Sequence, residues 1–337
     1  MSAVDAELEP GTGGPRSAAK AARRGRRVAL GDPIFKGLAV GSGIFLAATM
    51  FGLAAVLVYN SWPAITTLGT KVLTTVAWSP GTNEYGALAA LAGTFMSTLV
   101  AMVIAVPLAL VIALLLVELV HPAVSRVVGT AIEMLASIPS IVFGMVGIFV
   151  IVPFVQDHFV PWLYSTPLGN LPGIRPGMQF QGGGVSVFTA GVVLAFMILP
   201  FITAVSRDVM KMVPQVTKEA GYGMGSTTWE VMRKISLRYA NSGIVGAVFI
   251  GLGRALGETM AVAFLIGSVF TDIPKSLFDP GTSIASLIAL QFNEATDKIT
   301  VSALIELGLI LFVITILFQI AAQAWLRRVQ RATGGRA

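Results

Sequence analysis

The chain has no cysteine and only two histidines, and each shortage excludes a class of chemistry. Without cysteine it can form no disulfide, no thiol nucleophile and no thiolate metal site. His121 and His158 lie too far apart in the sequence to form a metal-binding motif. The Gly-x-x-x-x-Gly-Lys-Ser/Thr loop that cradles nucleotide phosphates is also missing. We therefore expect no catalytic residue, no metal site and no directly bound cofactor, and so not an enzyme.

Charge is scarce as well, because Asp, Glu, Lys and Arg make up 12% of the 337 residues, whereas apolar residues make up 55%. A soluble domain carries about 25% charged residues. A soluble fold of this length would therefore have too little charge to cover its surface, a requirement that a lipid environment removes. No stretch is polar enough for a separate soluble domain, so the composition predicts one membrane domain with tails and loops.

Six apolar stretches are long enough to cross a bilayer, which takes about 20 helical residues. They cover residues 37–59, 87–120, 127–154, 187–205, 244–270 and 299–325. Pro107 is expected to kink the second stretch. We predict an all-α membrane protein with about six transmembrane helices. Its parts are a basic tail that is expected to be disordered (1–36), a transmembrane domain (37–326) and a C-terminal tail (327–337).

Lysine and arginine are distributed unevenly between the segments that join these stretches. They gather in the N-terminal tail, in the segment between the fourth and fifth stretches, and in the C-terminal tail. The alternate loops hold only Lys71, Arg175, Lys275 and Lys298. Because short cytoplasmic loops are enriched in Lys and Arg, both termini are predicted to be cytoplasmic. This orientation signal explains the net charge of +6 more simply than nucleic-acid binding, so no nucleic-acid partner is expected.

Two external segments differ in their composition. Phe154–Ser186 is rich in proline and glycine, which predicts turns instead of a helix. Thr271–Lys298 is mixed and predicts a short helix at about residues 283–292. Either segment would dock an external partner or serve as a plain connector.

The cytoplasmic loop at residues 206–240 is the most informative segment. Pro214 suits the first turn of a short helix, which the glycines that follow would end. Thr227 and Glu230 have the spacing of a capping box for a second short helix. Two short helices joined by a glycine hinge would form a compact projection that fits a groove on another protein.

This loop resembles the cytoplasmic loop of ABC importer permeases, which reads Glu-Ala-Ala, three residues, Gly, nine residues, Ile-x-Leu-Pro. The matching residues are Glu219, Ala220, Gly225, Ile235 and Leu237. The sequence departs from the pattern at Gly221, where Ala is usual, and at Arg238, where Pro is usual. The resemblance implies the type I importer permease (MetI-like) fold and a loop that couples the permease to an ATPase subunit. The alternative is an ordinary amphipathic loop.

The fifth stretch carries two charges, Arg254 and Glu258, in an apolar setting. Arg254 lies about 15 Å along the predicted helix, and Glu258, four residues on, would share its face. Either the two form a structural ion pair, or Arg254 binds an oxyanion in the pathway while Glu258 orients it. We favour the pathway interpretation, with Thr259 beside them. Gly253 and Gly257 form a small-xxx-small pair for close packing, against a second permease or within this chain.

Three segments resemble the PstC-type permease subunits of bacterial phosphate ABC importers. They are Gly251–Val262, Glu133–Gly144 and Gly93–Pro107. The resemblance implies a bacterial plasma membrane location, a role for Arg254 and Glu258 in phosphate movement, and half of a translocation pathway. It also implies three partners: a PstA-like second permease, a PstB-like ATPase dimer that uses the ATP, and a PstS-like extracytoplasmic phosphate-binding protein.

Two alternatives remain open on the residues alone. A permease for another oxyanion, such as sulfate or molybdate, would need the same arginine chemistry, because Arg254 alone cannot distinguish tetrahedral anions. An ion-coupled secondary transporter is the other, although no internal repeat is found. Two further acids, Glu133 and Glu306, are expected to be structural and to pair with other groups.

Overall fold

The computed structural model describes residues 15–167 and 184–332, with side chains described between Pro33 and Arg328 except that of Ile34. The chain divides into two units, residues 1–56 and residues 57–337. The first unit consists of most of helix α1, Pro15–Leu68. From Phe35 onward its apolar side chains are exposed, as a helix that meets lipid requires.

The tail was predicted to be disordered through residue 36, but α1 begins at Pro15. Residues 15–30 are rich in alanine, lysine and arginine, which are strong helix formers, and no apolar stretch is needed for them to continue the helix. The structure thus describes residues 15–36 as helical, and the tail boundary at residue 36 stays a prediction. The remaining part of the tail, residues 1–14, lies outside the described residues.

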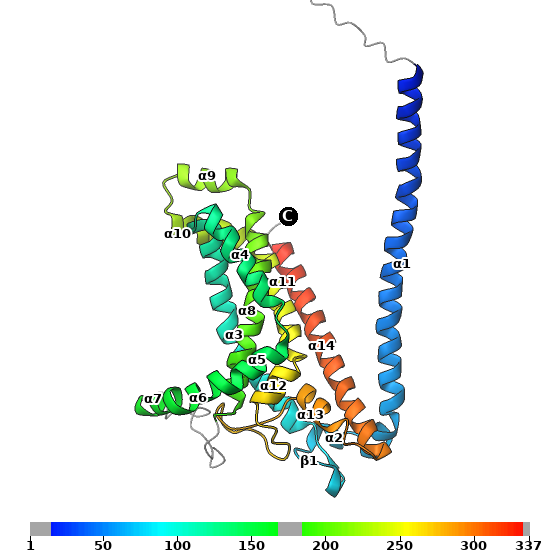
Figure 1. The fold of residues 1–337 in the computed structure, drawn as a ribbon, viewed down its shortest axis with the longest axis vertical. Coiled ribbons are helices and arrows are strands. Elements are labelled where there is room, and N and C mark those ends of the chain that lie inside the picture. The colour runs from blue at the N-terminus through cyan, green and yellow to red at the C-terminus, as the bar shows by residue number, and fades with distance from the viewer. Residues whose placement is uncertain (1–14, 168–183, 333–337) are drawn as a thin grey trace, which may run out of the picture. The chain divides into compact units, whose positions relative to one another are not determined.

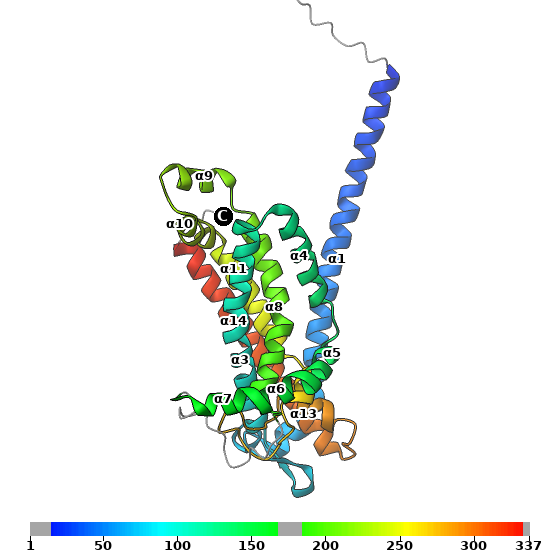
Figure 2. The ribbon, with the colours of Figure 1, turned by 60° about the vertical axis from the view of Figure 1, so that its left-hand side comes forward.

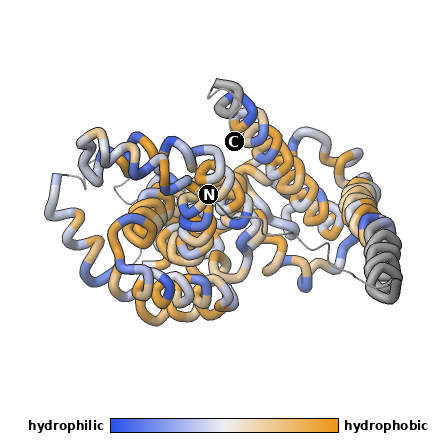
Figure 3. Tube along the Cα trace, turned by 90° about the horizontal axis from the view of Figure 1, so that it is seen from above, coloured by the Kyte–Doolittle hydropathy of each residue, from blue (hydrophilic) through white to orange (hydrophobic). Residues whose placement is uncertain are grey.

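The second unit is a bundle in which four long helices run side by side (Figures 1 and 2). These are α3, Leu88–Leu114; α8, Val187–Lys211; α11, Leu237–Leu256; and α14, Lys298–Ala332. A π-helical turn, Leu115–Leu119, extends α3. Within the residues that the structure describes, six helical segments are long and apolar enough to span a membrane, which confirms the predicted number. Viewed along the bundle, hydrophobic residues dominate the helices (Figure 3).

The core of the bundle lies where α3 meets α8. Alanines 101, 105 and 109 of α3 are fully buried and pack with Leu194 and Ile198 of α8. A side chain at Gly191 would meet Val100 at 2.7 Å. Small residues let two helix backbones approach closely, which is how helices associate when lipid surrounds them.

The third span differs from the prediction of one helix over 127–154. Helix α4, Pro122–Ala136, ends at Ser137, and the chain turns before Pro139, because a residue that precedes proline disfavours helical geometry. Three short helices follow, joined by π-helical turns. They are α5, Ser140–Val146; α6, Val152–Phe154; and α7, Val160–Ser165. Figures 1 and 2 show them crossing the end of the bundle opposite α9, whereas α4 runs along it.

Helix also extends into the segment that was predicted to form turns. The chain remains helical from Phe154 to Ser165, and Pro161 occupies the first turn of α7, where proline is tolerated. The prediction is wrong for these residues. The remainder of the predicted turn region, residues 168–183, lies outside the described residues.

The fifth span is also interrupted. Helix α11 ends at Leu256, and a separate short helix, α12, covers Met260–Leu265. The chain then turns at Gly267, whose φ of +103° suits glycine. The prediction of one helix over 244–270 is therefore wrong. Gly267 supplies the backbone freedom that this turn needs.

Short elements cover the bundle end that α5–α7 cross (Figure 1). They are α2, Lys71–Thr74; β1, Trp78–Ser79; β2, Glu84–Tyr85; and α13, Ile284–Gln291. The two strands pair antiparallel, with Trp78 opposite Tyr85. Helix α13 confirms the short helix that the sequence predicted there.

A glycine and a threonine of α3 hold α13 in place. A side chain at Gly93 would lie 2.0 Å from the carbonyl oxygen of Thr282, so only glycine allows this approach. The next residue, Thr94, accepts a hydrogen bond from the Ile284 N–H at 3.0 Å. Gly93-Thr94 opens one of the three segments that resemble the phosphate permeases, and here it docks the start of α13.

Candidate functional site

The loop that projects from the bundle has the two-helix form that the sequence predicted (Figure 1). Helix α9 covers Gln215–Gly223, and helix α10 covers Thr228–Val231. The capping box is complete, because Thr227 Oγ1 accepts the Glu230 N–H at 3.3 Å and Glu230 Oε2 accepts the Thr227 N–H at 3.1 Å. Gly225, at φ +82°, makes the turn between the helices.

The residues of the importer motif divide into an inner and an outer set. Gly221 is buried, and a side chain there would meet Ile235 Cδ1 at 2.6 Å. Leu237 packs with the buried cluster that includes Met210. Gly221 and Ile235 pack α9 against the segment that follows α10, and Leu237 packs the start of α11 against the bundle. Glu219, Ala220 and Gly225 are exposed and form the outer face.

The departures from the motif have a local explanation. At Gly221 the Ile235 side chain fills the space that the usual alanine methyl would take. At Arg238 the helix continues without a break into α11, and an arginine keeps the backbone N–H that a proline would remove. The loop therefore keeps its two-helix form despite both departures.

A buried ion pair joins the loop to the second span, and sequence reasoning missed it. Lys218 Nζ of α9 lies 2.6 Å from Glu118 Oε1, and both side chains are less than one-tenth exposed. Ser236 Oγ donates a second hydrogen bond to the same carboxylate oxygen at 2.7 Å. An acid in the last turn of an apolar span was the available signal. The three residues make a fixed link between the loop and α3.

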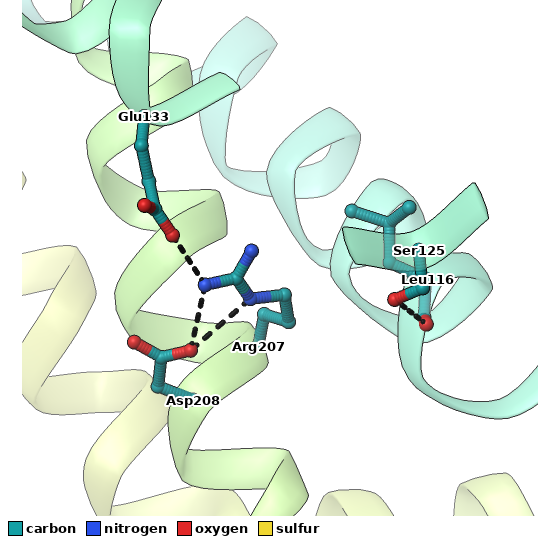
Figure 4. A network of polar contacts seen from close by, with 5 residues as sticks. All are labelled: Leu116, Ser125, Glu133, Arg207 and Asp208. Carbon is teal, nitrogen blue, oxygen red and sulfur yellow. Dashed lines mark hydrogen bonds and ion pairs between the residues drawn. The ribbon is translucent and has the colours of Figure 1, made fainter. Parts of the chain in front are cut away.

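A second ionic network joins α4 to α8 near the same end (Figure 4). Arg207 Nη2 lies 2.5 Å from Glu133 Oε1 and 2.8 Å from Asp208 Oδ1. A side chain at Gly129 would lie 2.0 Å from Arg207 Nη1, so glycine makes room for the guanidinium. Glu133 thus pairs with another helix. Glu306, by contrast, is buried in α14 and has no ion pair within the described part of the chain.

The break in the fifth span separates the two charges that were predicted to share a helical face. Arg254 is exposed on the last turn of α11, whereas Glu258 follows the end of that helix. Glu258 Oε1 accepts the Ala261 N–H at 3.4 Å, and Thr259 Oγ1 donates to the Gly257 carbonyl at 3.3 Å. The prediction of a common helical face is wrong. None of the ion pairs found among the described residues joins Arg254 to Glu258.

The glycine pair of the fifth span faces two different surroundings. A side chain at Gly253 would meet Gln319 Nε2 of α14 at 3.2 Å, so that glycine packs within this chain. Gly257 is exposed, and a side chain there would meet only the Gly253 carbonyl oxygen, at 3.7 Å. Packing of Gly257 against a second permease stays a prediction.

Residues 105–331 match the family described as the binding-protein-dependent transport system inner membrane component. The chain belongs to this family. The match includes the α9–α10 loop, the broken fifth span and both ionic networks. The chain is accordingly a multi-pass membrane permease component and not an enzyme.

Curated members of this inner membrane family include close relatives. The phosphate transport system permease protein PstC of Pasteurella multocida (strain Pm70) is 47% identical over 86% of this chain and 90% of its own length. PstC of Mesorhizobium japonicum is 43% identical over 92% of this chain and 94% of its own. PstC 1 of Mycobacterium tuberculosis is 35% identical, with 81% of each chain covered.

Solved structures show the same fold at much lower identity. One chain belongs to a bacterial alginate ABC transporter in complex with an alginate pentasaccharide-bound periplasmic protein. It matches with a TM-score of 0.55 and 16% identity over 90% of this chain and 96% of its own. A chain of the inward-facing MetNI methionine ABC transporter matches with a TM-score of 0.51 and 20% identity, over 72% of this chain and 93% of its own. The likeness confirms the predicted importer permease fold.

Proposed function

We propose that this chain is the permease subunit of an ATP-driven phosphate importer in a bacterial plasma membrane. The observation that carries the proposal is the 47% identity to a phosphate permease over 86% of the chain. The exposed arginine in the broken fifth span supports it, because a guanidinium fork matches phosphate oxygens.

Three partners complete the proposed importer. A second, PstA-like permease would supply the other half of the pathway. A PstB-like ATPase dimer would bind and hydrolyse ATP, since this chain has no phosphate-binding loop of its own. A PstS-like binding protein would deliver phosphate to the external face. No cofactor is proposed to bind this chain directly.

The α9–α10 loop is the proposed contact with the ATPase. Glu219 and Ala220 lie on its exposed face and would meet the ATPase. Lys218 connects the same helix to Glu118 at the end of the second span, so a displacement of α9 would reach α3 through a buried ion pair. This is a direct route from ATPase movement to the bundle.

The proposed orientation puts this loop, the N-terminal tail and the C-terminal tail in the cytoplasm. Lysine and arginine are concentrated in all three, as expected for cytoplasmic segments. The domain limits at residues 36 and 326 are part of this proposal.

Arg254, Glu258 and Thr259 are the proposed pathway residues. The helix break leaves Arg254 without a carboxylate partner in the described part of the chain, so its donors are available to an anion. Glu258 accepts a hydrogen bond at the start of α12 and would act through repulsion of a nearby anion, not by pairing with Arg254. Weak holding of this kind suits a transporter, which must release what it binds.

Uptake of radiolabelled phosphate tests the proposal. Cells that lack this chain would be complemented with wild type, Arg254→Gln or, as a control for charge, Arg327→Gln in the exposed last turns of α14. Membrane expression would be matched. We expect wild type and the control to restore ATP-dependent uptake, and Arg254→Gln to lose most of it.

Each other result excludes part of the proposal. If Arg254→Gln restores uptake as well as wild type does, Arg254 is not a pathway residue. If sulfate or molybdate enters and phosphate does not, the chain serves another oxyanion. If uptake survives ATP depletion but collapses with the ion gradient, the chain works as a secondary transporter.

A further inference from the structure

A basic cavity lies beside the α9 anchor, separate from the proposed pathway residues. Its volume is about 430 Å³, and its walls come from the end of α3, the first turns of α4, the end of α8 and the start of α9. Four cationic side chains line it: Arg126, Arg207, Lys211 and Lys218. Within the described part of the chain, Glu133 is the one carboxylate that lines the cavity.

Two of these cations are not used by the fold. Lys218 is held by Glu118, and Arg207 by Glu133 and Asp208. Arg126 and Lys211 are exposed, and no carboxylate of residues 33–167 or 184–328 forms an ion pair with either. Two unpaired cations facing one cavity repel each other, and an anion between them would remove that repulsion.

Neutral donors complete the site. The Thr130 hydroxyl and the Gln215 amide line the same cavity. Gln215 is the first residue of α9, whose N-terminus has no side-chain cap and no acidic residue in its first turn. The free N–H groups and the dipole at a helix N-terminus favour an anion. Arg207 Nη1 points away from both carboxylates (Figure 4) and packs against Gly129 of α4.

We propose that this cavity binds a phosphate group, held by Arg126 and Lys211 with support from Arg207 and the start of α9. Arginine and lysine together with helix N–H groups are the usual donors to phosphate oxygens. The apolar part of the lining comes from Leu116, Val117, Val120 and Pro122.

Two sources could supply the phosphate group. A phospholipid headgroup could enter from the membrane, because exposed apolar side chains on α4, such as Val124 and Val127, continue the apolar wall outward. Basic pockets between transmembrane helices bind anionic headgroups in this way. Free inorganic phosphate could instead enter from the water at this end of the bundle.

Binding to the full chain in phosphatidylcholine nanodiscs separates these sources. One arm adds a small fraction of phosphatidylglycerol and measures bound lipid by native mass spectrometry. The other adds radiolabelled inorganic phosphate and measures bound label. Both compare wild type with Arg126→Gln/Lys211→Gln and with the charge-matched control Arg327→Gln/Arg328→Gln, whose positions are exposed and outside the cavity.

We expect the cavity variant to bind one of the two probes about tenfold more weakly than wild type, with the control unchanged. A loss in the lipid arm identifies a headgroup site, and a loss in the phosphate arm identifies a free phosphate site. Equal binding by wild type and the cavity variant in both arms would overturn the proposal. So would an equal loss in the control, since surface charge alone would then explain binding.

Two points keep the test decisive. Arg126 and Lys211 are exposed and unpaired, so their replacement removes no fold contact, and the single variant Lys211→Gln should show a smaller loss. The measurement involves no transport, so its failure would leave the importer proposal standing. Failure of uptake with Arg254→Gln would likewise say nothing about this cavity.

Discussion

At the bundle end that carries α9, Lys218 and Arg207 are held in short ion pairs, whereas Arg254 at the break of the fifth span forms none among the described residues. Lys218 and Glu118 are both buried, and Lys218 Nζ and Ser236 Oγ donate to the same carboxylate oxygen of Glu118. Arg254 is exposed on a helix that stops two residues later. A buried charge pair that loses one partner is strongly destabilising, whereas an unpaired, accessible charge costs the fold little to lose. The Lys218–Glu118 pair should therefore matter for stability, whereas Arg254 should matter for transport with little effect on stability.

Of the changes considered, removal of one partner of the buried Lys218–Glu118 pair should lower the free energy of unfolding most. Glu118→Ala leaves Lys218 buried without its carboxylate and leaves Ser236 without its acceptor. We expect the free energy of unfolding to fall by about 3–5 kcal/mol. Thermal unfolding of the detergent-solubilised chain would measure it.

The matched control uses another ion pair of the same loop. Glu230 and Lys234 lie 3.1 Å apart on the surface, and such pairs contribute about 0–1 kcal/mol. Lys234→Ala removes that pair and leaves the capping box intact. If this control destabilises the chain as much as Glu118→Ala does, burial is not what makes the Lys218 link strong.

An added side chain at Gly221, where α9 meets Ile235, should lower the free energy of unfolding by an intermediate amount. Gly221→Ala places a methyl group 2.6 Å from Ile235 Cδ1, so the Ile235 side chain or α9 must shift. Overpacking of this kind costs about 1–3 kcal/mol. The chain offers a control at Gly223, where an added methyl meets nothing within 4 Å. Thermal unfolding should show a loss for Gly221→Ala and none for Gly223→Ala.

A second change tests the stated contact. Ile235→Val removes the Cδ1 atom that the alanine would meet, so the double variant should recover part of the loss. If the two effects simply add, the Gly221–Ile235 contact is not the cause. The usual alanine of the importer motif would then fit this loop without strain.

The same contrast explains how much could be predicted from the sequence. Length and hydropathy gave the number of spans, and the capping box and glycine hinge gave the α9–α10 form, because these signals are local. The Lys218–Glu118 pair joins residues 100 positions apart. No pattern within one element could indicate it.

The two broken helices show where local signals conflict. Residues 127–154 and 244–270 are predominantly apolar, so hydropathy alone predicts continuous helices. The break in the third span follows from Pro139, whereas at the break in the fifth span Gly257 has a φ of −93°, which any residue can adopt. The assumption that Arg254 and Glu258 share a helical face failed because it depended on an unbroken helix.

The smallest expected effect on stability is at Arg254. Arg254→Gln breaks no ion pair among the described residues, so the free energy of unfolding should change by no more than about 0.5 kcal/mol. Thermal unfolding beside Glu118→Ala would measure both ends of the comparison in one experiment. A fall in the free energy of unfolding of more than about 1 kcal/mol would contradict the view that Arg254 does not stabilise the fold. It would also mean that lost uptake in this variant reports damage to the fold. The pathway role would then need a variant that keeps the charge, such as Arg254→Lys. Lysine retains a cation but lacks the planar fork that matches phosphate.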